Sequence, residues 1–312
     1  MRSYVVGLGG GLAVALVVAA GLAVGLNYID DSGTAPVVQS ERATATAIAP
    51  DPTATPTPAA TPTPTPTLYV VDAAAELALA RPEIEAALAG FDGDWGFHVI
   101  ELASGAELGI NESQNFYPAS SGKIILAIAV LRQVEQGIRE FQPIQDRYEQ
   151  MMLISSDEAA DDMDALVNEN ETLQVFRDSG ASEASAFPGW RSGWVTPRDL
   201  ALVWKALVDG MLLNEENTAY LLDLTGRYEM DPIFQTFPVR LNREGYLYGQ
   251  KAGYNIQNFP HTFVGAGYTL SADFRYGFVA VLILRTDRTA GDTHDQRTRV
   301  YPILASHLLP PE

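Results

Sequence analysis

An irregular segment passes into an apolar run at the stretch Phe116-Tyr117-Pro118-Ala119-Ser120-Ser121-Gly122-Lys123. Ser120 and Lys123 stand three positions apart, so on a helix their side chains share one face, about one turn apart. A hydroxyl beside an amine is the arrangement that a serine nucleophile needs, because a free hydroxyl is a weak nucleophile at neutral pH. The N–H groups at a helix start also favour an oxyanion. We therefore expect a serine nucleophile on the first turn of a helix.

The run that follows continues to about Gly137 with few polar interruptions. Its apolar residues recur at helical spacing, which predicts a buried central helix. These residues are Ile124, Ile125, Ala127, Ile128, Leu131 and Val134. The Ser-x-x-Lys pattern alone is short, and a helix-capping serine followed by a solvated lysine is the structural alternative. The rest of the chain has to decide between the two interpretations.

Composition excludes several kinds of chemistry. The 312-residue chain has no cysteine, which rules out disulfides, thiolate metal sites, a cysteine nucleophile and a lipidated cysteine anchor. Its formal net charge of −19 argues against a nucleic-acid partner, because phosphates are bound by Lys and Arg. The four histidines show no metal-ligand spacing. We therefore expect neither a metal site nor a cofactor.

The N-terminal segment, residues 1–31, contains an apolar run, 4–26, that is long enough to span a bilayer. Arg2 precedes the run, and the positive-inside rule then places everything after it outside the cytoplasm. A cleaved signal peptide is the alternative, since residues 23–25 resemble a small-x-small cleavage site. The run is longer than a usual signal core, which favours an uncleaved anchor. We expect a single-pass protein of the cell membrane with an extracytoplasmic domain.

Residues 32–67 are a low-complexity segment of Thr, Ala and Pro, which predicts an extended linker without a core. The folded domain is expected over 68–312. Strand patterns occur at both ends of this domain and helical patterns lie between them. The expected strands are 97–102, 107–110, 245–251, 261–270 and 276–285. The expected helices are 82–90, 120–137, 143–153, 157–168, 197–210 and 293–308.

Three short motifs follow one another along this domain: Ser120-Ser121-Gly122-Lys123, Ser156-Asp157-Glu158 and Lys251-Ala252-Gly253. They resemble the Ser-x-x-Lys, Ser-Asp-Asn and Lys-Thr-Gly series of class A β-lactamases and, more broadly, of the penicillin-recognising serine enzymes. The resemblance covers roughly residues 82–308. It implies an α/β fold of the α+β kind, the β-lactamase/transpeptidase-like fold. In that fold helices flank an antiparallel sheet and an all-helical subdomain is inserted.

The resemblance implies a role for each position. Ser120 would attack the carbonyl of a β-lactam or of a peptidoglycan-type peptide, while Lys123 holds or takes its proton. Ser156 would relay a proton to the leaving nitrogen, and Lys251 would attract the substrate carboxylate. The backbone N–H groups of Ser120 and Tyr254 would form the oxyanion hole. The residues expected to bind substrate are Ala252, Gly253, Tyr254 and His261.

Two positions depart from the family pattern. Glu158 stands where the family has Asn, and an ionised carboxylate can only accept hydrogen bonds, whereas an amide also donates. Glu158 could pair with Lys123 and keep it charged, or it could be the base itself. Ala252 replaces Thr, and the lost hydroxyl should weaken recognition of a penicillin-like carboxylate by ~1 kcal/mol or somewhat more.

The acidic loop motif that class A enzymes use to hydrolyse the acyl-enzyme is not recognisable, and the loop is shortened. Glu183 is either a substitute for the deacylating base or a solvated loop acid, and the second interpretation is favoured. Two hypotheses follow. In the first, the chain is a membrane-tethered serine hydrolase that forms an acyl-enzyme on Ser120. In one form of this hypothesis it is a D,D-peptidase-like penicillin-binding protein, and its deacylation is slow. Alternatively, it is a weakly catalytic or non-catalytic module that binds wall material or peptides.

Overall fold

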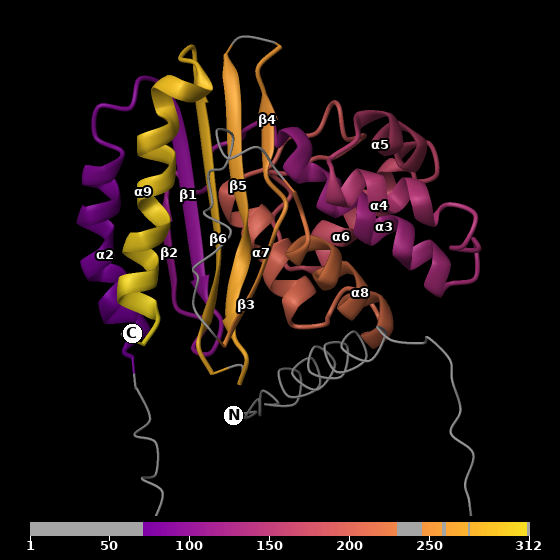
Figure 1. The fold of residues 1–312 in the computed structure, drawn as a ribbon, viewed down its shortest axis with the longest axis horizontal. Helices are drawn as coiled ribbons and strands as arrows, with labels where there is room; N and C mark the ends of the chain where they lie inside the picture. Colours follow the sequence, from indigo (N-terminus) through magenta and orange to yellow (C-terminus); the bar gives the residue numbers. More distant parts are fainter. Residues whose placement is uncertain (1–70, 230–244, 258–259, 274, 311–312) are drawn as a thin grey trace, which may run out of the picture.

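The computed structural model describes residues 71–229, 245–257, 260–273 and 275–310. In this part of the chain six strands form one antiparallel sheet, ordered β2-β1-β6-β5-β3, with β4 also paired to β5 (Figure 1). The strands are β1 (Asp94–Glu101), β2 (Glu107–Ile110), β3 (Tyr246–Gln250), β4 (Gly253–Asn255), β5 (His261–Ser271) and β6 (Gly277–Thr286). The predicted class, an antiparallel sheet flanked by helices with a helical section inserted in the chain, is confirmed.

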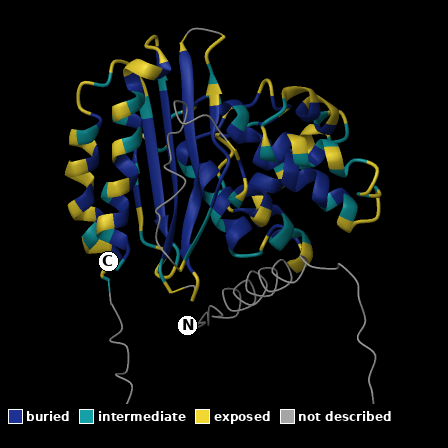
Figure 2. Cartoon of the chain, viewed as in Figure 1, coloured by how far each residue is buried: buried dark blue, intermediate teal, exposed yellow. Residues whose placement is uncertain are grey.

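Two helices from opposite ends of the domain cover one face of the sheet, α2 (Ala73–Ala87) and α9 (Ala290–Leu308) (Figure 1). They pack on alternate strand residues such as Phe97 and Val99, because successive side chains of a strand point to opposite faces. The central strands are buried, whereas the outward faces of α2 and α9 are exposed (Figure 2). The continuous apolar pattern of β6 is thereby explained, since both of its faces are covered.

The helical section lies on the other face of the sheet (Figure 1). α7 (Pro197–Val208) packs on the strands, and α3 (Lys123–Glu135) lies among the other helices with every residue from Ile124 to Leu131 buried. The remaining helices are α4 (Gln145–Leu153), α5 (Asp157–Asp164), α6 (Glu169–Asp178) and α8 (Glu215–Gly226). The predicted buried helix after the Ser-x-x-Lys motif is therefore confirmed, and it provides a rigid base for the motif.

The structure corrects the prediction for the first helix. The sequence predicts a helix that starts at Pro82 and ends at Gly90, but α2 begins at Ala73 and has Pro82 inside it. Asp72 caps the helix through a side-chain hydrogen bond to a first-turn N–H. Proline removes one helical hydrogen bond, and the burial of the turns on both sides of it against the sheet outweighs that loss.

The predicted anchor, 1–31, and the predicted linker, 32–67, both lie outside the described residues. Among the residues that the structure describes, no helix combines the length and the apolar character needed to cross a membrane.

Candidate active site

Ser120 lies in a 3₁₀ turn, η1 (Ala119–Gly122), directly before α3. Ser121 fixes this turn, because its Oγ and its N–H donate to the Pro118 carbonyl at 2.6 Å and 3.2 Å. Ala119 has a φ of +48°, a left-handed backbone that is strained for a residue with a Cβ and that often marks functional sites. The half-buried Ser120 thus sits at the start of a buried helix, as the sequence predicts.

The Lys123 amine is enclosed by oxygen atoms and an aromatic ring. Its side chain has no exposed area, and Nζ donates to Asp157 Oδ1 and to the Ser155 carbonyl, both at 2.7 Å. Ser155 Oγ lies 3.4 Å from the same nitrogen. Burial lowers the pKa of Lys123, and the hydrogen bond and charge of Asp157 partly oppose that shift. A lysine whose pKa is lowered in this way is suited to accept a proton from a neighbouring hydroxyl.

Lys251, which lies at the sheet, also contacts the Ser155 hydroxyl. It lies between β3 and β4, its N–H donates to the Ala266 carbonyl of β5 at 3.0 Å, and it is fully buried. Its Nζ donates to Ser155 Oγ at 2.9 Å and lies 4.0 Å from the ring centroid of Tyr228. Burial and then the positive charge of Lys123 hold the pKa of Lys251 well below its usual value. The Ser155 hydroxyl therefore lies between two buried amines.

The serine of the second motif is one residue earlier than predicted. The sequence analysis assigned Ser156 to this position, but Ser155 contacts the two lysines. Ser156 instead caps α5, since its Oγ accepts a hydrogen bond from the N–H of Ala159 at 3.2 Å. Ser155 has a φ of +59°, a strained left-handed backbone conformation that differs from that of the helix after it.

The acidic residue of the second motif is also one position earlier than predicted. Asp157, and not Glu158, contacts Lys123. The Glu158 side chain is 77% exposed and pairs with Arg147 at 3.2 Å, so it neither pairs with Lys123 nor lies where a base would be needed. The ion pair with Lys123 that was predicted for Glu158 is formed by Asp157 instead. Asp157 therefore occupies the position at which the family has an amide.

The third motif meets the first at Gly253. A Cβ at this position would lie 2.9 Å from the backbone nitrogen of Ser120, so only glycine lets β4 approach η1 this closely. Ala252 beside it is fully buried, and Tyr254 on its other side is 39% exposed. His261 is buried at the start of β5, three positions along the strand from the residue that pairs with Gly253.

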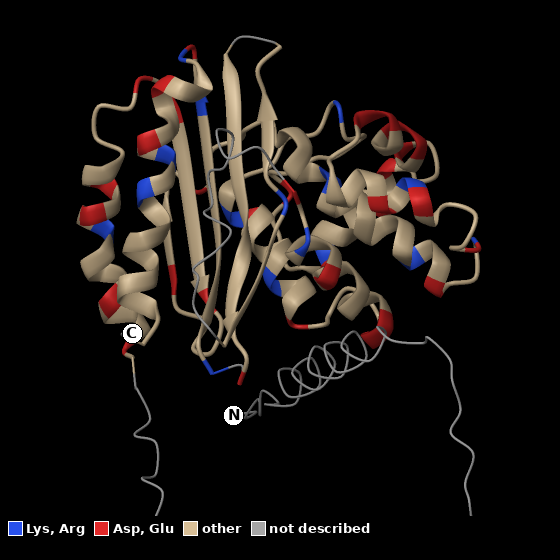
Figure 3. Ribbon diagram, viewed as in Figure 1, with Lys and Arg blue, Asp and Glu red and all other residues tan. Residues whose placement is uncertain are grey.

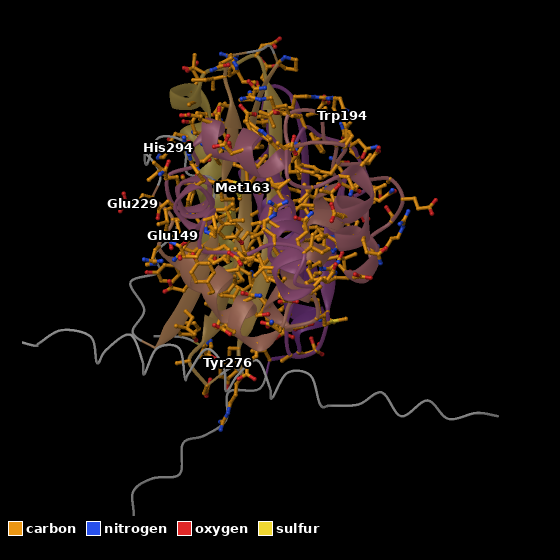
Figure 4. All side chains as sticks on the ribbon, turned by 90° about the vertical axis from the view of Figure 1, so that its right-hand side faces the viewer. Glu149, Met163, Trp194, Glu229, Tyr276 and His294 are labelled. Carbon is orange, nitrogen blue, oxygen red and sulfur yellow. The ribbon has the colours of Figure 1, made fainter. Side chains whose placement is uncertain are left out.

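The sequence leaves open whether Trp190 covers one end of the cleft or packs the short loop, and it does not indicate the contact with Lys123 that the structure shows. Its ring centroid lies 4.5 Å from Lys123 Nζ, and its side chain is almost completely buried. Trp194, four residues later, is 49% exposed and lies at the upper edge of the molecule, at the end opposite Tyr276 (Figure 4). Glu183, the acid weighed as a deacylating base, is exposed in the same loop.

Within the described ranges no group of three or more His, Asp or Glu side chains is placed to hold a metal ion.

The fold and the order of the motifs define the class: the chain has the β-lactamase/transpeptidase-like fold. Residues 79–146 match the model of the β-lactamase enzyme family, Beta-lactamase2. The resemblance that the three motifs indicated is thereby confirmed. A comparison with curated proteins found no match.

Three solved structures show what the chain is similar to. A β-lactamase from Sphaerobacter thermophilus is 19% identical with a TM-score of 0.63, and the match covers 76% of this chain and 99% of that one. The TLA-1 extended-spectrum β-lactamase is 14% identical with a TM-score of 0.66, over 75% and 100% of the two chains. The penicillin-binding protein PBP-A is 18% identical with a TM-score of 0.59, over 73% and 96%.

Proposed function

We propose that this protein is a serine hydrolase of the β-lactamase and penicillin-binding type that forms an acyl-enzyme on Ser120. One observation carries the proposal: the Ser155 hydroxyl lies between two buried amines, 2.9 Å from Lys251 Nζ and 3.4 Å from Lys123 Nζ. Buried amines without a function are costly, because each must be desolvated. Here they converge on one hydroxyl, beside the turn that carries Ser120.

Each step of the acylation has a group to perform it. Ser120 Oγ bonds to the substrate carbonyl carbon as its proton passes to Lys123. The carbon–nitrogen bond then breaks, and the leaving nitrogen takes the proton of Ser155 Oγ. Ser155 regains a proton from Lys123, so the net change is transfer of one proton from Ser120 to the leaving nitrogen. The N–H groups of Ser120 and Tyr254 are proposed to stabilise the developing oxyanion.

The proposed substrate is a β-lactam or a peptidoglycan-type peptide, because both present a carbonyl next to a nitrogen that can leave. A solved structure of a PBP-A mutant, which is 18% identical to this chain with a TM-score of 0.59, is an acyl-enzyme complex with penicillin G. That protein's ligand supports a penicillin as the first probe here. The apolar segment 4–26 supports a location at the cell membrane, with the domain outside the cytoplasm.

The experiment uses a fluorescent penicillin and intact-mass spectrometry on the full 312-residue chain. We expect an adduct of one penicillin mass that maps by peptide digestion to Ser120. Ser120→Ala should give no adduct while its thermal unfolding stays close to that of the parent. A Ser120→Ala variant that is labelled or hydrolyses nitrocefin like the parent would refute the assignment.

A second candidate, a wall- or peptide-binding module without turnover, is favoured by a specific contact. Asp157 forms an ion pair with Lys123 at 2.7 Å, which opposes the neutral amine that a base requires. The absence of any adduct at high penicillin concentration, together with retention of the chain on peptidoglycan, would support this candidate over the first.

A further inference from the structure

The surroundings of the Lys123 amine bear on what happens after acylation. Hydrolysis of an acyl-enzyme needs a water molecule beside the ester and a base that takes its proton. The ester would form on Ser120, whose turn leads directly into Lys123, the first residue of α3 and the proposed base of acylation. The surroundings of the Lys123 amine are therefore where a hydrolytic water is sought. The structure places there the Ser155 carbonyl, the Asp157 carboxylate and the ring of Trp190.

Several contacts hold the Trp190 indole in this position. Its ring N–H donates to Asp161 Oδ1 at 2.9 Å, and its backbone N–H donates to Asp164 Oδ1 at 3.2 Å. The Arg191 guanidinium lies 4.2 Å from the ring centroid and makes two hydrogen bonds of 2.8 Å with Asp161. With 4% of its surface exposed, Trp190 presents an apolar face to the amine. A cation–π contact of this kind stabilises a buried ammonium without any water.

α5 is rich in acidic residues (Figure 3), and each of its acids already has a partner in the structure. Asp157 is bound to Lys123, and Asp161 is bound to Arg191 and to the indole N–H. The other pairs are Glu158 with Arg147, Asp162 with Arg147, and Asp164 with the Trp190 N–H. The acid nearest the amine is thus already a partner of the amine.

We propose that Trp190 excludes the hydrolytic water from the Lys123 side of the acyl bond, so that the acyl-enzyme on Ser120 is long-lived. The inference rests on the proposed function. In hydrolysis the water oxygen bonds to the ester carbon, its proton goes to a base, and the bond from that carbon to Ser120 Oγ breaks as Oγ is protonated. Acylation does not need that water, so Trp190 slows only the second half of the reaction. The protein is then a penicillin-binding protein with slow turnover.

The experiment separates the two halves by pulse and chase. The full chain is labelled with fluorescent penicillin, excess unlabelled penicillin is added, and loss of label is followed by gel fluorescence and intact mass. We expect Trp190→Ala to release the label about tenfold faster or more, because water reaches the ester. Trp190→Gln replaces the apolar ring by a smaller polar amide that binds water, and it should also release the label faster. The glutamine variant provides the test if the alanine variant does not fold.

Two matched variants serve as controls. Trp194→Ala removes an exposed tryptophan of the same loop and should release label at a rate within about threefold of the parent. Trp190→Phe keeps an aromatic face over Lys123 but loses the bond to Asp161, so it should release label more slowly than Trp190→Ala. In the alanine and glutamine variants the rate of label uptake should change less than the rate of label release. General damage to the site would slow the uptake as well, so this difference separates the two explanations.

The outcomes distinguish this inference from the proposed function. A parent that neither forms an adduct on Ser120 nor hydrolyses the penicillin would overturn the proposed function, and this inference with it. An adduct that the parent releases within seconds would overturn the inference alone. Equal release rates in the parent and in both the alanine and glutamine variants would overturn it as well.

Discussion

Two adjacent serines, Ser155 and Ser156, have different environments because the chain turns between them. Ser155 faces the two lysines and Ser156 caps α5. We expect Ser155→Ala to slow penicillin acylation by about a hundredfold or more, since it removes the proposed proton relay. Ser156→Ala should leave acylation nearly unchanged and cost about 1 kcal/mol of stability, as the loss of a helix cap does.

Stopped-flow labelling gives the acylation rates of these two variants, and urea unfolding gives their stabilities. If Ser156→Ala were the variant that abolished acylation, the sequence-based assignment of the motif would be right and the assignment from the structure would be contradicted.

Asp157 sets the pH at which Lys123 can act as a base. Burial lowers the pKa of Lys123, and Asp157 raises it by hydrogen bonding and by charge. Asp157→Asn removes the two largest raising influences on Lys123 and leaves burial and the charge of Arg191, which lower its pKa, opposed only by the charge of Asp161, so the pKa of Lys123 falls. Because the base must be neutral, the rising limb of the acylation rate should move to lower pH. Acylation rates measured between about pH 5 and pH 9 test this, and a limb that stays in place or moves to higher pH would contradict it.

At the scale of single residues, the sequence predicted the first and third motifs because their surroundings are distinctive: a buried apolar helix after Lys123, and a glycine after Ala252. It misplaced the second motif by one residue because Ser155 and Ser156 both fit a leading serine. Aspartate is closest in shape to asparagine, and that signal would have favoured Asp157 over Glu158. Trp190 could not be assigned to Lys123, because a contact across 67 positions depends on the path of a loop.

The two terminal helices are joined by a titratable contact. Each ring nitrogen of His307 on α9 lies beside a carboxylate of α2, with Nδ1 at 2.7 Å from Glu76 and Nε2 at 3.1 Å from Glu83, and a protonated ring donates to both. Burial alone would lower the pKa of His307, but the hydrogen bonds and charges of the two glutamates outweigh burial and raise it. Its stabilising contribution is therefore fully present below the unfolded pKa, about 6.5, and is lost as pH rises through the folded pKa.

We accordingly expect His307→Gln to lower the melting temperature more at about pH 5.5 than at about pH 8.5. Differential scanning calorimetry of the parent and the variant in the same buffers measures the difference. A gap between the two proteins that is constant with pH, or that widens as pH rises, would contradict the contribution assigned to this contact.

At the scale of elements, most helices and strands follow from apolar periodicity and from caps. β6 is a continuous apolar run, which predicts a strand covered on both faces, and α7 begins at Pro197 as predicted, with Thr196 as its cap. The first helix was placed too late because proline is favoured in a first turn, and the cap at Asp72 was overlooked. The order of the strands in the sheet could not be obtained from periodicity, and the family resemblance implied only an antiparallel sheet flanked by helices.

At the scale of the whole molecule, the predicted anchor can be tested independently of catalysis. We expect the full chain to partition into the membrane fraction and to be cleaved by protease added outside intact cells. A variant without residues 1–31 and with its own initiator methionine should remain in the soluble fraction. Recovery of the full chain in the soluble fraction, or protection from external protease, would contradict the proposed location.

The account as a whole depends on Ser120 becoming acylated while Lys123, Ser155 and Lys251 assist. Intact-mass spectrometry after incubation with penicillin, followed by peptide mapping, tests this most directly. The account predicts a single adduct of one intact penicillin mass on the peptide that contains Ser120, still present after the free drug is removed. A chain whose mass is unchanged at every penicillin concentration, or whose adduct maps to another residue, would contradict it.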